Sequence, residues 1–187
     1  MKVLKFGGTS VANPENINKV KSILGNQKND QMAVVVSAFG GVTDLLLNAS
    51  RLASEQDVSY KNSLKEIEDR HISAIRELIP VTSQSAALSK VKSELNILET
   101  LLEGAFLVGE LTPKLSDKIV SYGELLSSFI ISEFLKSEGL DVAFKDSREL
   151  YNIPLICFEF SLLLHQLTCE IFYRPTGHNN NDCTTRL

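Results

Sequence analysis

The chain has 187 residues, of which 43% are hydrophobic and 22% are charged, and its formal net charge is −4. This composition excludes a disordered chain, a collagen and a small disulfide-bonded scaffold. The acidic balance provides no basic field of the kind that binds nucleic acid. No early segment has the form of a signal peptide or the ~20 apolar residues of a membrane span. We therefore expect a globular protein with no nucleic-acid or membrane partner.

The composition changes near residue 150. Residues 151–187 contain no lysine, yet they hold all three cysteines, Cys157, Cys169 and Cys183. Cysteines without a secretion signal are typical of reduced thiols in the cytosol, which predicts a cytoplasmic protein. We treat 1–150 and 151–187 as separate segments.

The first 40 residues have the pattern of a strand, a helix and a second strand. Residues 2–6 form a short apolar run that ends at Gly7-Gly8, and Asn13-Pro14-Glu15 has the capping pattern of a helix that closes at Gly25. Residues 32–36 are continuously apolar and β-branched, which indicates a central strand covered on both faces. This βαβ unit predicts parallel strands.

The following 100 residues are predicted to be mainly helical. A helix should begin near Val42, and residues 64–79 and 86–107 should form an antiparallel helical pair broken by Pro80. A further helix is expected between Pro113 and Gly139, with Ser116 as a plausible cap. Residues 141–144 should form another parallel strand. The fold class is therefore α/β, with a mainly parallel sheet flanked by helices and a projecting helical pair.

The first candidate site follows the first strand. Its glycines would let a backbone approach a ligand closely and would free N–H groups to face an anion, as in a phosphate loop. The same pair of glycines also fits a simple turn, and the spacing matches neither common nucleotide-binding fingerprint. The residues concerned are Lys5, Gly7, Gly8, Thr9 and Ser10.

Two more candidate sites follow. The segment Ser37–Asp44 carries small residues and hydroxyls from the second strand to a helix start, where Thr43 and Asp44 could also merely cap the helix. In Ser121–Glu124, the glycine at 123 is costly inside a helix and predicts a close approach by another helix or a ligand. Glu124 could accept hydrogen bonds from a substrate ammonium, or be a surface glutamate. We expect the loops to share one sheet edge.

His71 lies on the apolar stripe of a predicted helix and is interpreted as a packing residue. No spacing of His, Cys, Asp and Glu indicates a metal site, and nothing resembles a catalytic triad.

Three segments in this order, KFGGTSVAN at 5–13, VVVSAFGGVTDLL at 34–46 and LSDKIVSYGELLSS at 115–128, resemble the aspartokinases. The similarity is greatest to the kinase part of bifunctional aspartokinase–homoserine dehydrogenases, and covers roughly residues 1–150. It implies a partial amino-acid kinase (carbamate kinase-like) fold. It also implies ATP-dependent phosphorylation of L-aspartate to 4-phospho-L-aspartate, the first step of lysine, threonine and methionine synthesis, with Mg²⁺ and ATP. Family members generally self-associate.

The resemblance also implies roles for single residues. Lys5 matches the lysine that stabilises charge on the transferring phosphoryl group, and Glu124 matches the glutamate that holds the aspartate amino group. Substrate-loop residues are matched by Ser37 and Thr43. The loop around the ATP phosphates is matched by Gly7, Gly8, Thr9 and Ser10.

The resemblance stops near residue 150, where GRGGSD-like and TDVDGVYT-like segments of the family do not follow. We interpret residues 151–187 as an atypical, poorly ordered tail. Our hypothesis is that the reading frame is broken near residue 150 and that this tail is translated out of frame. The 187-residue chain is then an incomplete and inactive catalyst. Two alternatives stay open: another amino-acid kinase family member, acting on glutamate, carbamate or a nucleotide monophosphate, and a non-catalytic remnant or interaction module.

Overall fold

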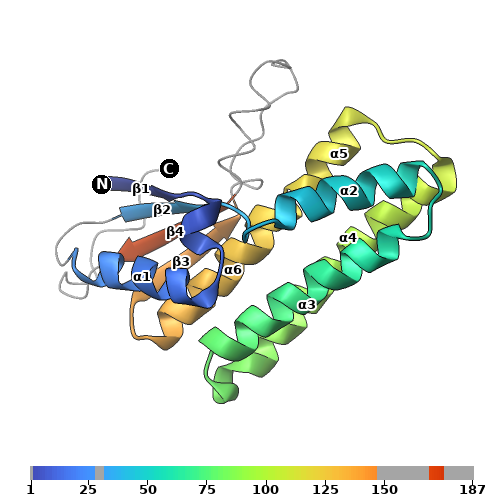
Figure 1. Ribbon diagram of the computed structural model, residues 1–187. Helices are drawn as coiled ribbons and strands as arrows, with labels where there is room; N and C mark the ends of the chain where they lie inside the picture. The colour runs from blue at the N-terminus through green and yellow to red at the C-terminus, as the bar shows by residue number, and fades with distance from the viewer. Residues whose placement is uncertain (1, 28–31, 147–168, 175–187) are drawn as a thin grey trace, which may run out of the picture.

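The computed structural model describes residues 2–27, 32–146 and 169–174 (Figure 1). They form one four-stranded sheet in the order β1-β2-β4-β3, with helices packed on it and a helical region beside it. Strands β1 (Lys2–Phe6) and β2 (Met32–Val36) pair in parallel, with Lys2 opposite Met32 and Phe6 opposite Val36. Every residue of β2 is buried, as its continuous apolar run predicted.

The other two strands come from positions far apart in the sequence. Strand β4 (Cys169–Arg174) pairs antiparallel with β2 on one side and with β3 (Asp141–Asp146) on the other. Strand β3 therefore runs in the same direction as β1 and β2, but it is not a direct neighbour of β2.

Strand β4 was not expected from the sequence, because residues 151–187 were grouped together by composition. Within that segment, Ile171, Phe172 and Tyr173 are β-branched and aromatic residues, which favour strands whatever the composition around them. The rest of the proposed tail, 151–168 and 175–187, lies outside the described residues. The assignment of 151–187 as a separate, atypical segment stays a prediction.

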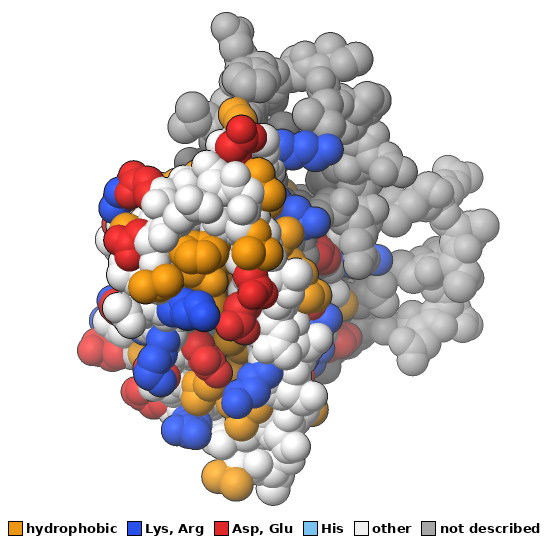
Figure 2. All heavy atoms as spheres, turned by 90° about the vertical axis from the view of Figure 1, so that its right-hand side faces the viewer, with side chains coloured by type: hydrophobic (Ala, Val, Ile, Leu, Met, Phe, Trp, Pro, Cys, Tyr) orange, Lys and Arg blue, Asp and Glu red, His pale blue; other side chains and the backbone are white. Residues whose placement is uncertain are grey.

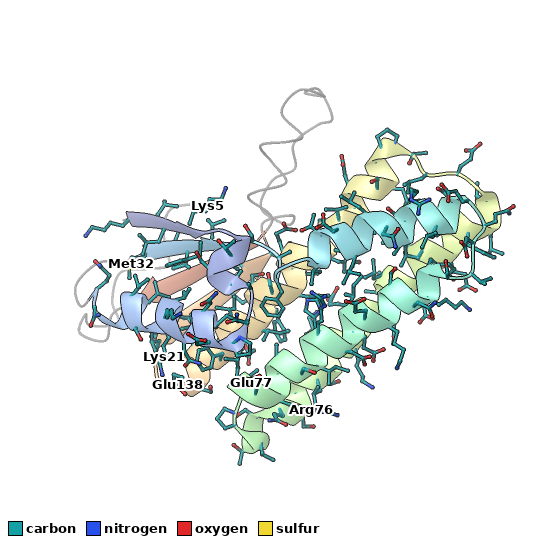
Figure 3. All side chains as sticks on the ribbon, in the orientation of Figure 1. Lys5, Lys21, Met32, Arg76, Glu77 and Glu138 are labelled. Carbon is teal, nitrogen blue, oxygen red and sulfur yellow. The ribbon has the colours of Figure 1, made fainter. Side chains whose placement is uncertain are left out.

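Two helices pack near the sheet. Helix α1 (Pro14–Gly25) follows a short 3₁₀ helix, η1 (Gly8–Val11), and helix α6 (Tyr122–Ser137) contacts β2, β3 and β4. Lys21 of α1 joins the two helices: its Nζ lies 2.7 Å from Glu138 Oε2 and 5.7 Å from the centroid of the Phe134 ring (Figure 3). The start of α6 lies beside the carboxyl end of β2, where the Ser127 hydroxyl donates a hydrogen bond to the Ser37 carbonyl.

A helical region projects from the sheet (Figure 1). Helices α3 (Tyr60–Leu78) and α4 (Val81–Val108) pack against each other on either side of Pro80, which confirms the predicted helical pair and lengthens it. Helices α2 (Val42–Ser54) and α5 (Pro113–Val120) lie against this pair. Figure 2 shows the free end of the region, where basic and acidic side chains are interspersed with hydrophobic ones.

The N-terminal capping residue was predicted correctly for α1 but not for α5. The Asn13 side chain caps α1 by accepting a hydrogen bond from the Asn16 N–H, as its position before Pro14 predicted. The cap of α5 is Thr112, whose hydroxyl accepts from the Leu115 N–H, so Ser116 as a cap was wrong. A hydroxyl residue immediately before a proline is the better cap, because proline is favoured at the first helical position. No helix in the described part is long and apolar enough to cross a membrane.

Candidate functional site

A cavity of about 630 Å³ lies at the carboxyl end of β1 and β2, between η1, the start of α2 and the α5–α6 junction. It is lined by five of the predicted site residues: Gly8, Thr9, Ser37, Thr43 and Glu124. The first two follow β1, the next two flank the β2–α2 loop, and the glutamate lies in the first turn of α6. The expected convergence at one sheet edge is thus observed for these five residues.

Three predicted residues do not line this cavity: Lys5, Gly7 and Ser10. Lys5 is an exposed residue of β1 opposite Val35, and its side chain points to the face of the sheet away from α1 (Figure 3). In β1, Leu4 and Phe6 have the less exposed side chains, so the alternation of the strand sends Lys5 to the other face. The structure therefore does not bring Lys5 together with Glu124 at this cavity, and the role of Lys5 stays a prediction.

Gly123 explains how α6 comes so close to the β2–α2 loop. A Cβ at this position would lie 2.8 Å from Ala38 Cβ, closer than real Cβ atoms approach, and 3.2 Å from Leu46 Cδ1, tighter than most real contacts. The predicted close approach is therefore made by the loop and by α2. The glycine brings the neighbouring Glu124 against the loop, where the glutamate lines the cavity and its Oε2 is buried.

The β2–α2 loop is fixed from several directions. The Ser127 hydroxyl of α6 donates a hydrogen bond to the Ser37 carbonyl (2.9 Å), and the Phe39 ring stacks on His71 of α3 with centroids 5.2 Å apart. These contacts hold the backbone of Ser37 and the ring of Phe39 in place at the cavity wall.

His71 is a packing residue, as predicted. It is fully buried, and its Nδ1 lies 2.6 Å from the Ile67 carbonyl oxygen, which makes Nδ1 the protonated nitrogen of the neutral ring. Burial lowers the pKa of His71 to about 4, because a charged imidazolium would lose its hydration. The histidine is therefore neutral near pH 7 and supports the loop through Phe39.

Two lining residues, Ser116 and Asp117 of α5, were missed by reasoning from the sequence. A spacing of seven residues, about two helical turns, separates Asp117 from Glu124 and could have placed both on one face of a continuous helix. The cavity lining also includes Asp44, which the sequence suggested only as a helix-start residue. Three carboxylates therefore line the cavity, those of Asp44, Asp117 and Glu124. The described lining has no lysine or arginine, so the cavity suits a ligand with a positively charged group.

The carboxylates of the cavity are not arranged as a metal centre. Within residues 2–27, 32–146 and 169–174, no group of three or more His, Cys, Asp or Glu side chains is placed to hold a metal ion.

Comparison with known proteins agrees with the geometry. The family model described as "Amino acid kinase family" matches residues 1–160, which extends ten residues beyond the change in composition. Bifunctional aspartokinase/homoserine dehydrogenase 2 of Zea mays is 31% identical over 148 residues, covering 79% of this chain and 16% of that protein. Aspartokinase 1 of Arabidopsis thaliana is 32% identical over 151 residues, covering 79% and 26%.

A solved structure is similar as well. Aspartokinase III of E. coli, in complex with aspartate and ADP, superposes with a TM-score of 0.66 at 29% identity, covering 75% of this chain and 30% of that one. The chain thus spans between about one sixth and one third of the length of these relatives. The parallel β1–β2 unit and the cavity at its carboxyl end agree with the family match over residues 1–160. The chain therefore belongs to the amino acid kinase family, and its curated relatives are aspartokinases.

Proposed function

We propose that this chain carries the aspartate-binding part of an aspartate kinase. The reaction is the ATP-dependent phosphorylation of L-aspartate to 4-phospho-L-aspartate, the first step of lysine, threonine and methionine synthesis. The observation that carries the proposal is the meeting of Gly8, Thr9, Ser37, Thr43 and Glu124 at one cavity, although they come from three separate segments of the sequence.

Each of these residues has a role that its chemistry suits. The Glu124 carboxylate accepts hydrogen bonds from the ammonium group of aspartate, and the hydroxyls of Ser37 and Thr43 donate to its carboxylates. Gly8 and Thr9, with Gly7 and Ser10 beside them, face the phosphates of ATP. Phosphoryl transfer depends mainly on positioning and electrostatic stabilisation, and these groups contribute to positioning.

Lys5 is the proposed catalytic residue, and its ammonium would stabilise the charge that develops on the transferring phosphoryl group. Mg²⁺ enters with ATP as part of the substrate complex. Support for these small-molecule partners comes from the E. coli relative, whose structure contains aspartate and ADP. Self-association and a cytoplasmic location are part of the same proposal.

The three carboxylates of the cavity favour an amino-acid substrate over one without an ammonium group. A carboxylate–ammonium contact is a charge-assisted hydrogen bond, and the loss of such a bond costs about 1.5–3 kcal/mol. This corresponds to a roughly 10- to 150-fold weaker affinity for a ligand that lacks the amine.

Binding of L-aspartate and of succinate to the 187-residue chain, measured by calorimetry or by NMR titration, tests the proposal. Succinate has the same two carboxylates but no ammonium. We expect L-aspartate to bind more tightly than succinate, and Glu124→Gln to abolish the difference.

Glu133→Gln is the matched control. Glu133 lies on the same helix and pairs with Lys136 (2.6 Å), away from the cavity, so this variant should keep the preference for L-aspartate. Equal binding of the two ligands by the unmodified chain, or a preference that survives in Glu124→Gln, would exclude this role for Glu124.

A further inference from the structure

The β2–α2 loop is a thin wall between two cavities. Phe39 and Gly40 line the candidate substrate cavity on one side, and on the other they line a second cavity of about 390 Å³ next to α3. Any displacement of this loop therefore changes the shape of the substrate cavity, even if its cause lies on the side of α3.

Arg70 of α3 holds this wall from the second cavity. Its Nη1 donates a hydrogen bond of 2.7 Å to the Gly40 carbonyl oxygen, and its Nη2 lies 2.6 Å from Glu66 Oε1. The planar guanidinium has donors in a fixed arrangement, so the bond to Glu66 orients the group that holds Gly40. The contact joins residues 30 positions apart and links the helical pair to the loop.

The loop is also restrained by close packing and by its own turn. A Cβ on Gly40 would lie 3.0 Å from Ala12 Cβ, so the backbone of the loop already packs tightly on the segment before α1. Gly41 has a φ of 77°, a left-handed conformation that glycine adopts without strain, and the Val42 N–H donates to the Phe39 carbonyl at 3.0 Å. Close packing against Ala12 and the hydrogen bond from Arg70 thus both restrain the loop at Gly40.

We propose that Arg70 is a positioning residue for the substrate loop. It does not line the substrate cavity, and it acts through the Gly40 carbonyl, which fixes the peptide between Ser37 and Thr43. The importance of the loop for aspartate rests on the proposed function, whereas the restraint that Arg70 places on the loop does not.

Amide hydrogen exchange of the 187-residue chain, followed residue by residue by NMR, tests the restraint. The Val42 amide reports on opening of the loop, and the Leu98 amide in the core of α4 reports on global stability. In Arg70→Gln we expect Val42 to exchange about tenfold faster while Leu98 is unchanged within about twofold. Arg70→Lys keeps one donor and should give an intermediate rate for Val42.

Arg76→Gln is the matched control. Arg76 is an exposed arginine near the C-terminal end of the same helix (Figure 3), and this variant should leave the Val42 rate unchanged. Equal Val42 rates in Arg70→Gln and Arg76→Gln would overturn the proposal, as would an equal acceleration of Val42 and Leu98. If Arg70→Gln does not fold, Glu66→Gln decides, because loss of the orienting carboxylate should still speed exchange at Val42 alone.

Titration with L-aspartate separates this inference from the proposed function. We expect Arg70→Gln to weaken aspartate binding about tenfold, Arg70→Lys to recover part of it, and Arg76→Gln to match the unmodified chain. If the unmodified chain does not bind aspartate, the proposed function fails, and the exchange rates still decide the role of Arg70.

Discussion

Gly123→Ala should destabilise the chain although alanine favours helices. The new Cβ would lie 2.8 Å from Ala38 Cβ and 3.2 Å from Leu46 Cδ1, so the β2–α2 loop or α2 must shift. Overpacking of this kind costs about 1–3 kcal/mol, and the gain in helix propensity offsets at most ~1 kcal/mol of it, because the position is in the first turn of α6. We expect a net loss of about 1 kcal/mol, or roughly 2–4 °C in Tm.

Gly104→Ala is the control for this prediction. Gly104 is an exposed residue inside α4, and a Cβ there would meet nothing within 4 Å. The same substitution should therefore stabilise the chain by about 0.5–1 kcal/mol. Thermal and denaturant unfolding, followed by circular dichroism, measures both variants. Equal stabilisation by the two substitutions would refute the close approach at Gly123.

Three further predictions concern pH and catalysis. The pKa of His71 is about 4 in the folded chain and 6.5 for a solvated imidazole, as in the unfolded chain. The stability that comes from the neutral ring is therefore fully present above pH 6.5 and is lost as the pH falls toward 4. This contribution to the unfolding free energy is on the order of 3 kcal/mol. His71→Phe should flatten the fall of the unfolding free energy between pH 6.5 and 4; an unchanged pH profile would exclude His71 as its cause. In a complete kinase that contains this segment, Lys5→Ala should lower kcat far more than it raises the KM for aspartate, since the ammonium acts mainly on the transition state; a change confined to KM would contradict this role. With ATP, aspartate and hydroxylamine, which converts an aspartyl phosphate to its hydroxamate and releases phosphate, the isolated 187-residue chain should form no hydroxamate. The described residues offer the proposed aspartate site and one glycine loop but no second phosphate loop; a rate of ~1 s⁻¹ or more would disprove it.

Much of the fold follows from local signals in the sequence. Asn13-Pro14 begins α1, Pro80 separates α3 from α4, and the apolar run at 32–36 forms the fully buried β2. Each signal depends on residues that are neighbours in the chain, so no tertiary information is needed to interpret it. Strand β4 has a local signal in Ile171, Phe172 and Tyr173, but its place in the sheet could not be predicted, because that place depends on β2 and β3, which lie far away in the sequence.

The candidate site was predictable where it follows strands. Gly8, Thr9 and Ser37 lie within three residues of the ends of β1 and β2, and Thr43 lies in the first turn of the helix that follows β2. The parallel pairing of those strands brings them to one edge. Ser116 and Asp117 could not be placed in the same way, because their position depends on how α5 docks against α2. The role of Arg70 could not be found from the sequence, since its partner is a backbone carbonyl 30 residues away.

The position of β4 has a consequence for the order in which the chain folds. Met32 of β2 is opposite Tyr173 of β4, so the central pairing of the sheet closes a loop of about 140 residues. The β1–α1–β2 unit and the α3–α4 pair have short sequence separations and can form early, whereas β3 can join the sheet only through β4. During synthesis on the ribosome, the edge of β2 therefore stays uncovered until residues 169–174 have emerged. A newly made chain therefore keeps this edge of β2 without its β4 partner until late in its synthesis, and an unpaired strand edge is a site for aggregation.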